Sequence, residues 1–133
     1  MIPSDDLSDA KIDLLLAQQG WQNRYRCLLQ WSKLISPKNE IRMKTYLVKG
    51  CALETWLYHE EHDGLHHFWV DSDSRVVKGL AVLLLLHINE QCSADIKTFN
   101  IDALMRKLEL EKHLSPSRGN GFKALWDAAQ AKL

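Results

Sequence analysis

The chain has 133 residues, a length that suits one domain with one hydrophobic core. Lysine and arginine together number 17, as do aspartate and glutamate, so the formal net charge is zero. No overall positive field is therefore available to hold nucleic acid or an anionic membrane. We expect one domain over residues 1–133 that meets a protein partner or a small substrate.

The N-terminal residues and the longest apolar run both argue against targeting to a membrane. Residues 1–6 are acidic and lack the basic and apolar regions of a secretory signal. The apolar run over residues 80–86 is far shorter than the ~20 residues that span a bilayer. The expected location is the cytoplasm, where the three cysteines should be free thiols.

Two helices are predicted before residue 37. Ser8 can cap a first helix near residues 8–19, which Gly20 would end. From Trp21, apolar residues recur at helical spacing until Ser36-Pro37 stops the run. The sequence therefore predicts a helical N-terminal quarter.

Between residues 41 and 70 the pattern changes to β-branched and aromatic residues, which favour strands. Short strands are predicted at residues 46–48, 55–59 and 66–70. Asp63-Gly64 lies between the last two and is a strong signal for a hairpin turn. We expect a small antiparallel sheet.

The next segment predicts a capped and buried helix. Residues 71–74 read Asp-Ser-Asp-Ser, which supplies several oxygens able to cap a helix N-terminus. The following run over residues 75–89 is apolar on nearly every side. Such a helix belongs in the centre of the core.

The last third predicts short helices and one loop. Helices are expected at residues 93–98 and 102–110, followed by a loop over residues 115–121. A final amphipathic helix then carries Phe122 and Trp126. The order of helices, small sheet and helices indicates one α+β domain.

Cys51 is the residue with the strongest case for chemistry. Gly50 before it can adopt a turn that other residues avoid, which would present the thiol in a loop. Lys49 is a nearby cation, which favours the thiolate that attacks sulfur. An inert packed cysteine is the competing interpretation, and it is the preferred one for Cys27 and Cys92, on or beside helices.

Four histidines gather around the predicted hairpin, at positions 59, 62, 66 and 67. With Cys51 they could imitate a zinc site of imidazole and thiolate ligands. His66 and His67 are adjacent, however, so in a strand they point to opposite faces. We favour a solvated hairpin and predict no metal site.

Arg118 and Asp73 each allow two interpretations. Arg118 lies in the predicted loop, where it either holds the loop to a carbonyl or carboxylate or provides a cation near the thiol. Asp73 is explained by helix capping without any functional role. These alternatives stay open on the residues alone.

Several segments together resemble the SufE/CsdE family of sulfur acceptor proteins. The resemblance covers residues 10–131 and rests on Gly50-Cys51 with Trp56 five residues on, and on the segments 21–26, 71–80 and 114–121. It implies a SufE/NifU-like α+β fold, with a small antiparallel sheet packed against several helices.

By that resemblance, Cys51 carries the persulfide, and its loop shelters the thiol until a cysteine desulfurase of the SufS or CsdA type docks. Gly50, Asp73 and Arg118 would support this loop or contact that partner. Pyridoxal phosphate belongs to the desulfurase, so no cofactor is expected in this chain. It would be a sulfur-transfer accessory protein rather than a stand-alone enzyme. The chain departs from the family pattern at Leu53 and Thr55, where a small polar residue and valine are usual.

The destination of the sulfur and two other classes of protein remain as alternatives. The sulfur would pass to an acceptor such as an iron–sulfur cluster scaffold, or to tRNA modification. A cluster scaffold of the IscU type would need several converging cysteines, and a thiol redox sensor would need a resolving cysteine near Cys51. The oligomeric state stays open between a monomer and a homodimer.

Overall fold

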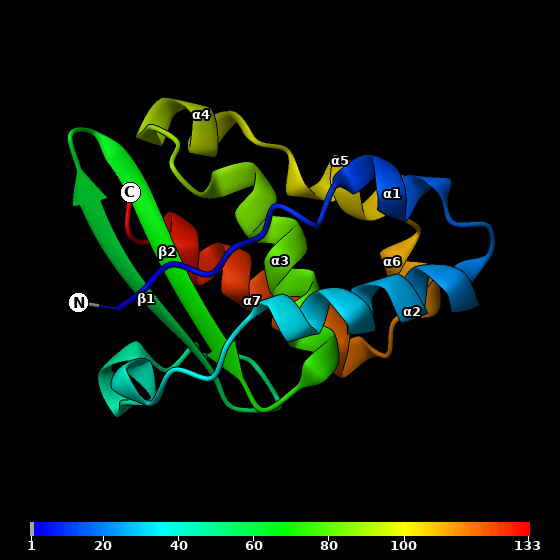
Figure 1. Ribbon diagram of the computed structural model, residues 1–133, viewed down its shortest axis with the longest axis horizontal. Coiled ribbons are helices and arrows are strands. Elements are labelled where there is room, and N and C mark those ends of the chain that lie inside the picture. Colours follow the sequence, from blue (N-terminus) through cyan, green and yellow to red (C-terminus); the bar gives the residue numbers. More distant parts are fainter. Residues whose placement is uncertain (1) are drawn as a thin grey trace.

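A long β-hairpin forms one side of the molecule (Figure 1) in this computed structural model, which describes residues 2–133. Strand β1 spans Thr55–His62, strand β2 spans Leu65–Ser72, and the two pair antiparallel along their whole length. Asp63 and Gly64 between them have φ values of 52° and 80°, the left-handed conformation that a two-residue hairpin turn needs. The predicted hairpin is confirmed, and it is the one sheet within the described residues.

Helices occupy the rest of the molecule, and α3 crosses its middle (Figure 1). Contacts join α3 to α2, α7 and β2, so this helix connects the hairpin to the other helices. The described chain is therefore α+β, as predicted. Its α-helices are α1 (Ile12–Ala17), α2 (Trp21–Trp31), α3 (Arg75–Ile88), α4 (Ser93–Thr98), α5 (Ile101–Lys107), α6 (Leu110–His113) and α7 (Pro116–Gln130). Short 3₁₀ turns are η1 (Ser32–Leu34), η2 (Asn39–Ile41) and η3 (Lys44–Tyr46).

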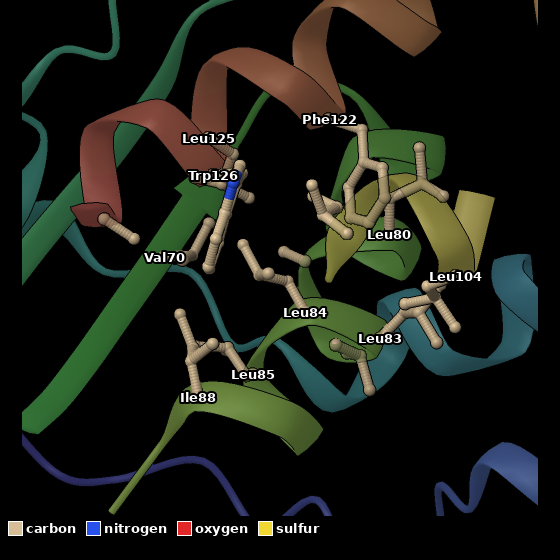
Figure 2. Packing of buried hydrophobic residues seen from close by; sticks show 14 of the residues in the cluster. Val70, Leu80, Leu83, Leu84, Leu85, Ile88, Leu104, Phe122, Leu125 and Trp126 are labelled. Carbon is tan, nitrogen blue, oxygen red and sulfur yellow. The ribbon is translucent and has the colours of Figure 1, made fainter. Parts of the chain in front are cut away.

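The core lies where α3 packs against α7 and β2. Figure 2 shows Leu80 and Leu84 of α3 beside Phe122 and Trp126 of α7, with Val70 of β2 close by. All five are at most 5% exposed. Each large apolar side chain buried in this way contributes about 1.5–3 kcal/mol to folding. The prediction that residues 75–89 form the central buried helix is confirmed.

The N-terminal helix differs from its prediction. It begins at Ile12 rather than residue 8 and ends at Ala17, and its N-cap residue, Lys11, makes no side-chain cap. Ser8 does not cap it, because the Ser8 amide donates to the Asp6 side chain (3.0 Å) within a preceding turn. The predicted Ser8 cap is wrong, although a helix and its end before Gly20 are confirmed.

The predicted strand at residues 46–48 is also absent from the described structure. Tyr46 closes the turn η3, and the backbone of this segment pairs with the sheet at a bridge between Leu47 and Trp56. The hydrogen bond from the Val48 amide to the carbonyl of Thr55 (2.8 Å) is part of this bridge. Because Tyr46 is part of η3 and the backbone turns at Gly50, too few residues lie between the two for a third strand.

Two predicted boundaries near the C-terminus are wrong. The helix expected at residues 102–110 is divided, because Glu109 takes a left-handed φ of 56° between α5 and α6. The segment 115–121, expected as a loop, is mostly helical, since α7 begins at Pro116. Proline suits the first turn of a helix, where its missing N–H is not needed. None of the helices in residues 2–133 combines the length and apolar character that crossing a membrane requires.

Candidate functional site

A pocket with a volume of about 310 Å³ opens beside Cys51. It lies where the loop before β1 meets the N-terminal ends of α3 and α7. Its size is at the lower end of small-molecule sites. The lining residues are Cys51, Ala52, Leu53, Ser74, Val77, Ser115, Ser117 and Arg118.

The loop that carries Cys51 turns at Gly50. Gly50 has a φ of 86°, a left-handed conformation that strains residues with a side chain, so the turn predicted here is present. The ends of the loop are held together by the Leu47–Trp56 bridge and by the hydrogen bond from Val48. This anchoring fixes where Cys51 enters the pocket.

The Cys51 sulfur is recessed against α7. The residue is half-buried, and its Sγ lies 3.3 Å from Oγ1 of Thr55. A β-carbon at Gly121 would lie only 3.1 Å from this sulfur and 3.4 Å from a methyl of Val77. The close approach of α7 therefore depends on glycine at position 121. Gly121 and Thr55 are site residues that the sequence interpretation missed, although the departure from valine at position 55 was a signal.

Arg118 is the one charged residue among those that line this pocket. It lies in the first turn of α7 rather than in a loop, because its amide donates to the carbonyl of Ser115 (3.1 Å). The guanidinium carbon lies 5.7 Å from the centre of the Tyr25 ring, a cation–π contact. Lys49, the other cation predicted near the thiol, is not part of this lining and instead borders a separate groove beside α7.

Asp73 lies outside the pocket lining, and its predicted capping role is wrong. The cap of α3 is Ser74, whose Oγ accepts from the amide of Val77 (3.2 Å). Asp73 is exposed and pairs with Nη1 of Arg42 at 2.9 Å. Its amide donates to the carbonyl of Glu54 (2.9 Å), which ties the end of the Cys51 loop to the start of α3.

Asp71 is the buried carboxylate of this segment. Its Oδ2 accepts hydrogen bonds from the Lys38 amide and from Nε of Arg42, both at 2.8 Å, and Oδ1 accepts from the Ser72 amide at 2.8 Å. Burial alone would raise the pKa of Asp71, but these hydrogen bonds, with the nearby charge of Lys78, outweigh it and lower the pKa. Asp71 therefore stays ionised and holds the segment before η2 against the hairpin.

The other two cysteines lie elsewhere. Cys27 is half-buried on α2, and burial raises the pKa of its thiol. Cys92 occupies the N-cap position of α4. Neither lines the pocket, and none of the three cysteines forms a disulfide within the described chain.

Two histidines of the hairpin, His59 and His66, hydrogen-bond to each other, and His66 also contacts the start of α4. Nε2 of His59 lies 2.7 Å from Nδ1 of His66, and Nε2 of His66 lies 2.6 Å from Oγ of Ser93. Burial, followed by the neighbouring His66, lowers the pKa of His59. His66 is only 1% exposed, so the solvated interpretation is wrong for that residue. Across residues 2–133, no three histidine, cysteine or acidic side chains are grouped so as to hold a metal ion.

Within the described residues, a hairpin packed on helices and one cysteine that lines a pocket define a thiol-presenting α+β domain. The chain belongs to the SufE family, since the family model described as "SufE: Fe-S metabolism associated domain" matches residues 9–133. The sulfur acceptor protein CsdE of Escherichia coli (strain K12) is 33% identical over 110 residues, which cover 81% of this chain and 75% of that protein.

A solved structure has the same fold. The solution structure of a hypothetical protein from Thermus thermophilus matches with a TM-score of 0.71 and covers 95% of this chain and 91% of that one. The two sequences are 19% identical, so this match concerns the fold alone. The predicted α+β fold of the SufE type is confirmed.

Proposed function

We propose that this protein is a sulfur acceptor that receives a sulfane sulfur on Cys51 and passes it to a further acceptor. The observation that carries the proposal is the placement of one cysteine sulfur at a small pocket, recessed against α7, while Cys27 and Cys92 lie outside it. The relative CsdE, which is named a sulfur acceptor, supports the same assignment. A recessed thiol is protected from the oxidation that an exposed thiolate suffers.

The transfer needs no oxidant or reductant beyond the two sulfur centres. The Cys51 thiolate attacks the terminal sulfur of a persulfide on the donor protein, and a new S–S bond forms at Cys51. The S–S bond of the donor breaks, and its electron pair leaves on the donor cysteine as a thiolate. The nucleophile of the next acceptor then attacks the outer sulfur. The S–S bond at Cys51 breaks, and Cys51 leaves as a thiolate.

The donor we propose is a pyridoxal-phosphate cysteine desulfurase, and the destination is iron–sulfur cluster assembly. The likeness to CsdE supports the donor, and the description of the family model supports the destination. Gly50 would shape the thiol loop, and Arg118, at the pocket edge, would meet the approaching persulfide or the desulfurase. Asp73, exposed beside the loop end, would contact the desulfurase rather than the thiol.

The experiment that tests this proposal is Cys51→Ser with intact-mass analysis after incubation with a desulfurase and free cysteine. Serine keeps the size of the side chain, but its hydroxyl stays protonated at neutral pH and cannot replace the thiolate. The variant should fold and bind the desulfurase, because docking uses a surface much larger than one atom. It should gain no sulfur and should not accelerate the turnover of cysteine.

Cys27→Ser and Cys92→Ser are the matched controls, and both should load one sulfur atom as the parent does. Stimulation of the desulfurase by Cys51→Ser at the parent level would mean that the protein acts by binding alone. Extra sulfur found mainly on Cys27 or Cys92 would also overturn the assignment. Transfer of labelled sulfur from Cys51 to a tRNA-modifying acceptor, and not to a cluster scaffold, would change the destination while leaving the carrier role intact.

A further inference from the structure

Two buried hydroxyl groups form a row of hydrogen bonds that leads from the Cys51 sulfur into the protein. Oγ1 of Thr55 lies 3.3 Å from the sulfur and 2.8 Å from Oγ of Ser72. Thr55 is 0% exposed and Ser72 is 2% exposed. Ser72 also accepts a hydrogen bond from the amide of Ser74 (3.1 Å), and the Thr55 hydroxyl has a further acceptor in the carbonyl of the exposed residue Leu53 (3.1 Å). The sulfur, the threonine and the serine thus form one hydrogen-bonded chain.

When Cys51 is a thiol, these hydrogen bonds can all point away from the sulfur. Each hydroxyl has one proton to donate and lone pairs to accept with. The S–H then donates to Thr55, Thr55 donates to Ser72, and Ser72 donates to the carbonyl of Glu54, which lies 3.2 Å away. Every proton in this arrangement has an acceptor.

When Cys51 is a thiolate, the same hydrogen bonds can all point toward the sulfur. Ser72 then donates to Thr55, and Thr55 donates to the sulfur. The Glu54 carbonyl loses its bond from Ser72 but keeps the bond from the Asp73 amide (2.9 Å). After the reversal this carbonyl still accepts one hydrogen bond, so the free-energy cost of an acceptor without a donor does not arise. Two hydroxyl rotations achieve it, with no movement of the backbone.

We propose that Thr55 is a positioning residue for sulfur transfer, whose hydroxyl turns to donate to the Cys51 sulfur whenever that sulfur is a thiolate. The inference rests on the proposed function and deepens it. The thiolate occurs twice in the cycle, first as the nucleophile and later as the leaving group. Hydrogen bonds to charged acceptors are about twice as strong as neutral ones, so Thr55 raises the fraction of Cys51 that is a thiolate before the attack and stabilises that thiolate as it leaves in the second step.

Valine is close to threonine in shape but has no hydroxyl. Thr55→Val is therefore a close match in shape that removes the donor, and Thr55→Ser retains a hydroxyl at the same place. Thr45→Val provides a control on an exposed threonine outside the Cys51 pocket.

The test measures alkylation of Cys51 by iodoacetamide across a series of neutral to alkaline pH values, in a Cys27→Ser, Cys92→Ser background. Thr55→Val should react about tenfold more slowly at neutral pH, the size expected for loss of one hydrogen bond to a charged group, and its pH profile should move to higher pH. Thr55→Ser and Thr45→Val should follow the parent profile.

An unchanged pH profile in Thr55→Val would overturn the proposal, even if the variant were less stable, because a purely structural threonine would affect folding and not the profile. If Thr55→Val does not fold, Ser72→Ala serves instead, with a smaller shift of the profile in the same direction expected and no shift counting against the proposal. The measurement needs no desulfurase. Failure here is therefore distinct from failure of the proposed function, which would appear as absence of sulfur on Cys51 in the parent protein.

Discussion

Asp71 and Ser72 are neighbours at the end of β2, yet they belong to two regions of different character. Asp71 is a fully buried carboxylate held by Arg42 and by backbone amides. Ser72 belongs to a chain of neutral hydroxyls that ends at the Cys51 sulfur. Adjacent residues of a strand point to opposite faces, so one strand end serves both regions.

This comparison shows that a rigid ion pair and an adaptable hydrogen-bond network can lie one residue apart. A buried charge must keep its partners, since leaving it unpaired costs several kcal/mol in free energy. Hydroxyl groups can exchange donor and acceptor roles at little cost. The Asp71 side is therefore suited to fixing the end of the hairpin, and the Ser72 side is suited to following a change of charge on sulfur.

The largest expected effect is loss of stability in Asp71→Asn. This change removes the buried charge that Arg42 faces and weakens the hydrogen bonds that hold the chain near Lys38. We expect the free energy of unfolding, measured with urea, to fall by about 3 kcal/mol. Asp73→Asn is the matched control, because Asp73 pairs with the same arginine while exposed, and it should cost less than about 1 kcal/mol.

The pH dependence of this pair sharpens the prediction. The folded pKa of Asp71 is lowered, so its contribution to stability is complete above the unfolded carboxyl value of about 3.9. The contribution is lost as the pH falls through the lowered folded pKa. The difference in the free energy of unfolding between the parent and Asp71→Asn should therefore become smaller in acid. A difference that stays constant with pH would show that Asp71 acts through its shape and not its charge.

A smaller effect on stability is expected when a methyl group is added to α7 beside the Cys51 sulfur. Gly119 and Gly121 both lie in α7, where replacing glycine by alanine gains up to about 1 kcal/mol of helix stability. A β-carbon at Gly119 meets nothing within 4 Å, whereas at Gly121 it meets the Cys51 sulfur at 3.1 Å. Gly119→Ala should be stabilising, and Gly121→Ala should be less stable than Gly119→Ala and should alter the alkylation rate of Cys51. Equal stability and equal alkylation would mean that the sulfur does not rest on α7.

The smallest effect on stability is expected for Arg118→Ala. The cation–π contact with Tyr25 is partly exposed, and its loss should cost about 0.5–1 kcal/mol in urea unfolding. Sulfur transfer from a desulfurase should nevertheless slow, because the pocket loses the one charge in its lining. Arg106→Ala, on exposed α5 surface, is a control of like chemistry. An unchanged transfer rate would leave Arg118 with a structural role only.

The parts of the fold that could be predicted are those specified by neighbouring residues. Asp63-Gly64 sets a hairpin turn locally, and an apolar run after Ser74 can only be a buried helix. Residues 115–121 were mispredicted because proline, serine and glycine are typical of loops, while the helix there is stabilised by burial of Phe122 and Leu125 on its next turns. Such packing is a tertiary effect that local propensity does not contain.

The site was predictable only at its centre. Cys51 and Gly50 are neighbours, so a turn that presents a thiol is visible in the sequence. Gly121 and Ser72 come from distant segments, and nothing local places Gly121 beside the sulfur or Ser72 beside Thr55. Asp73 carried a plausible local explanation, helix capping, and Ser74 takes that role instead.

The dependence of the pocket on α7 has a consequence for how the protein is made. Synthesis runs from the N-terminus, so the ribosome releases the hairpin and the Cys51 loop well before the helix that carries Gly121. A nascent chain that ends before Pro116 lacks one wall of the pocket, and its sulfur has no cover on that side. Protection of the thiol is therefore completed only after α7 has left the ribosome.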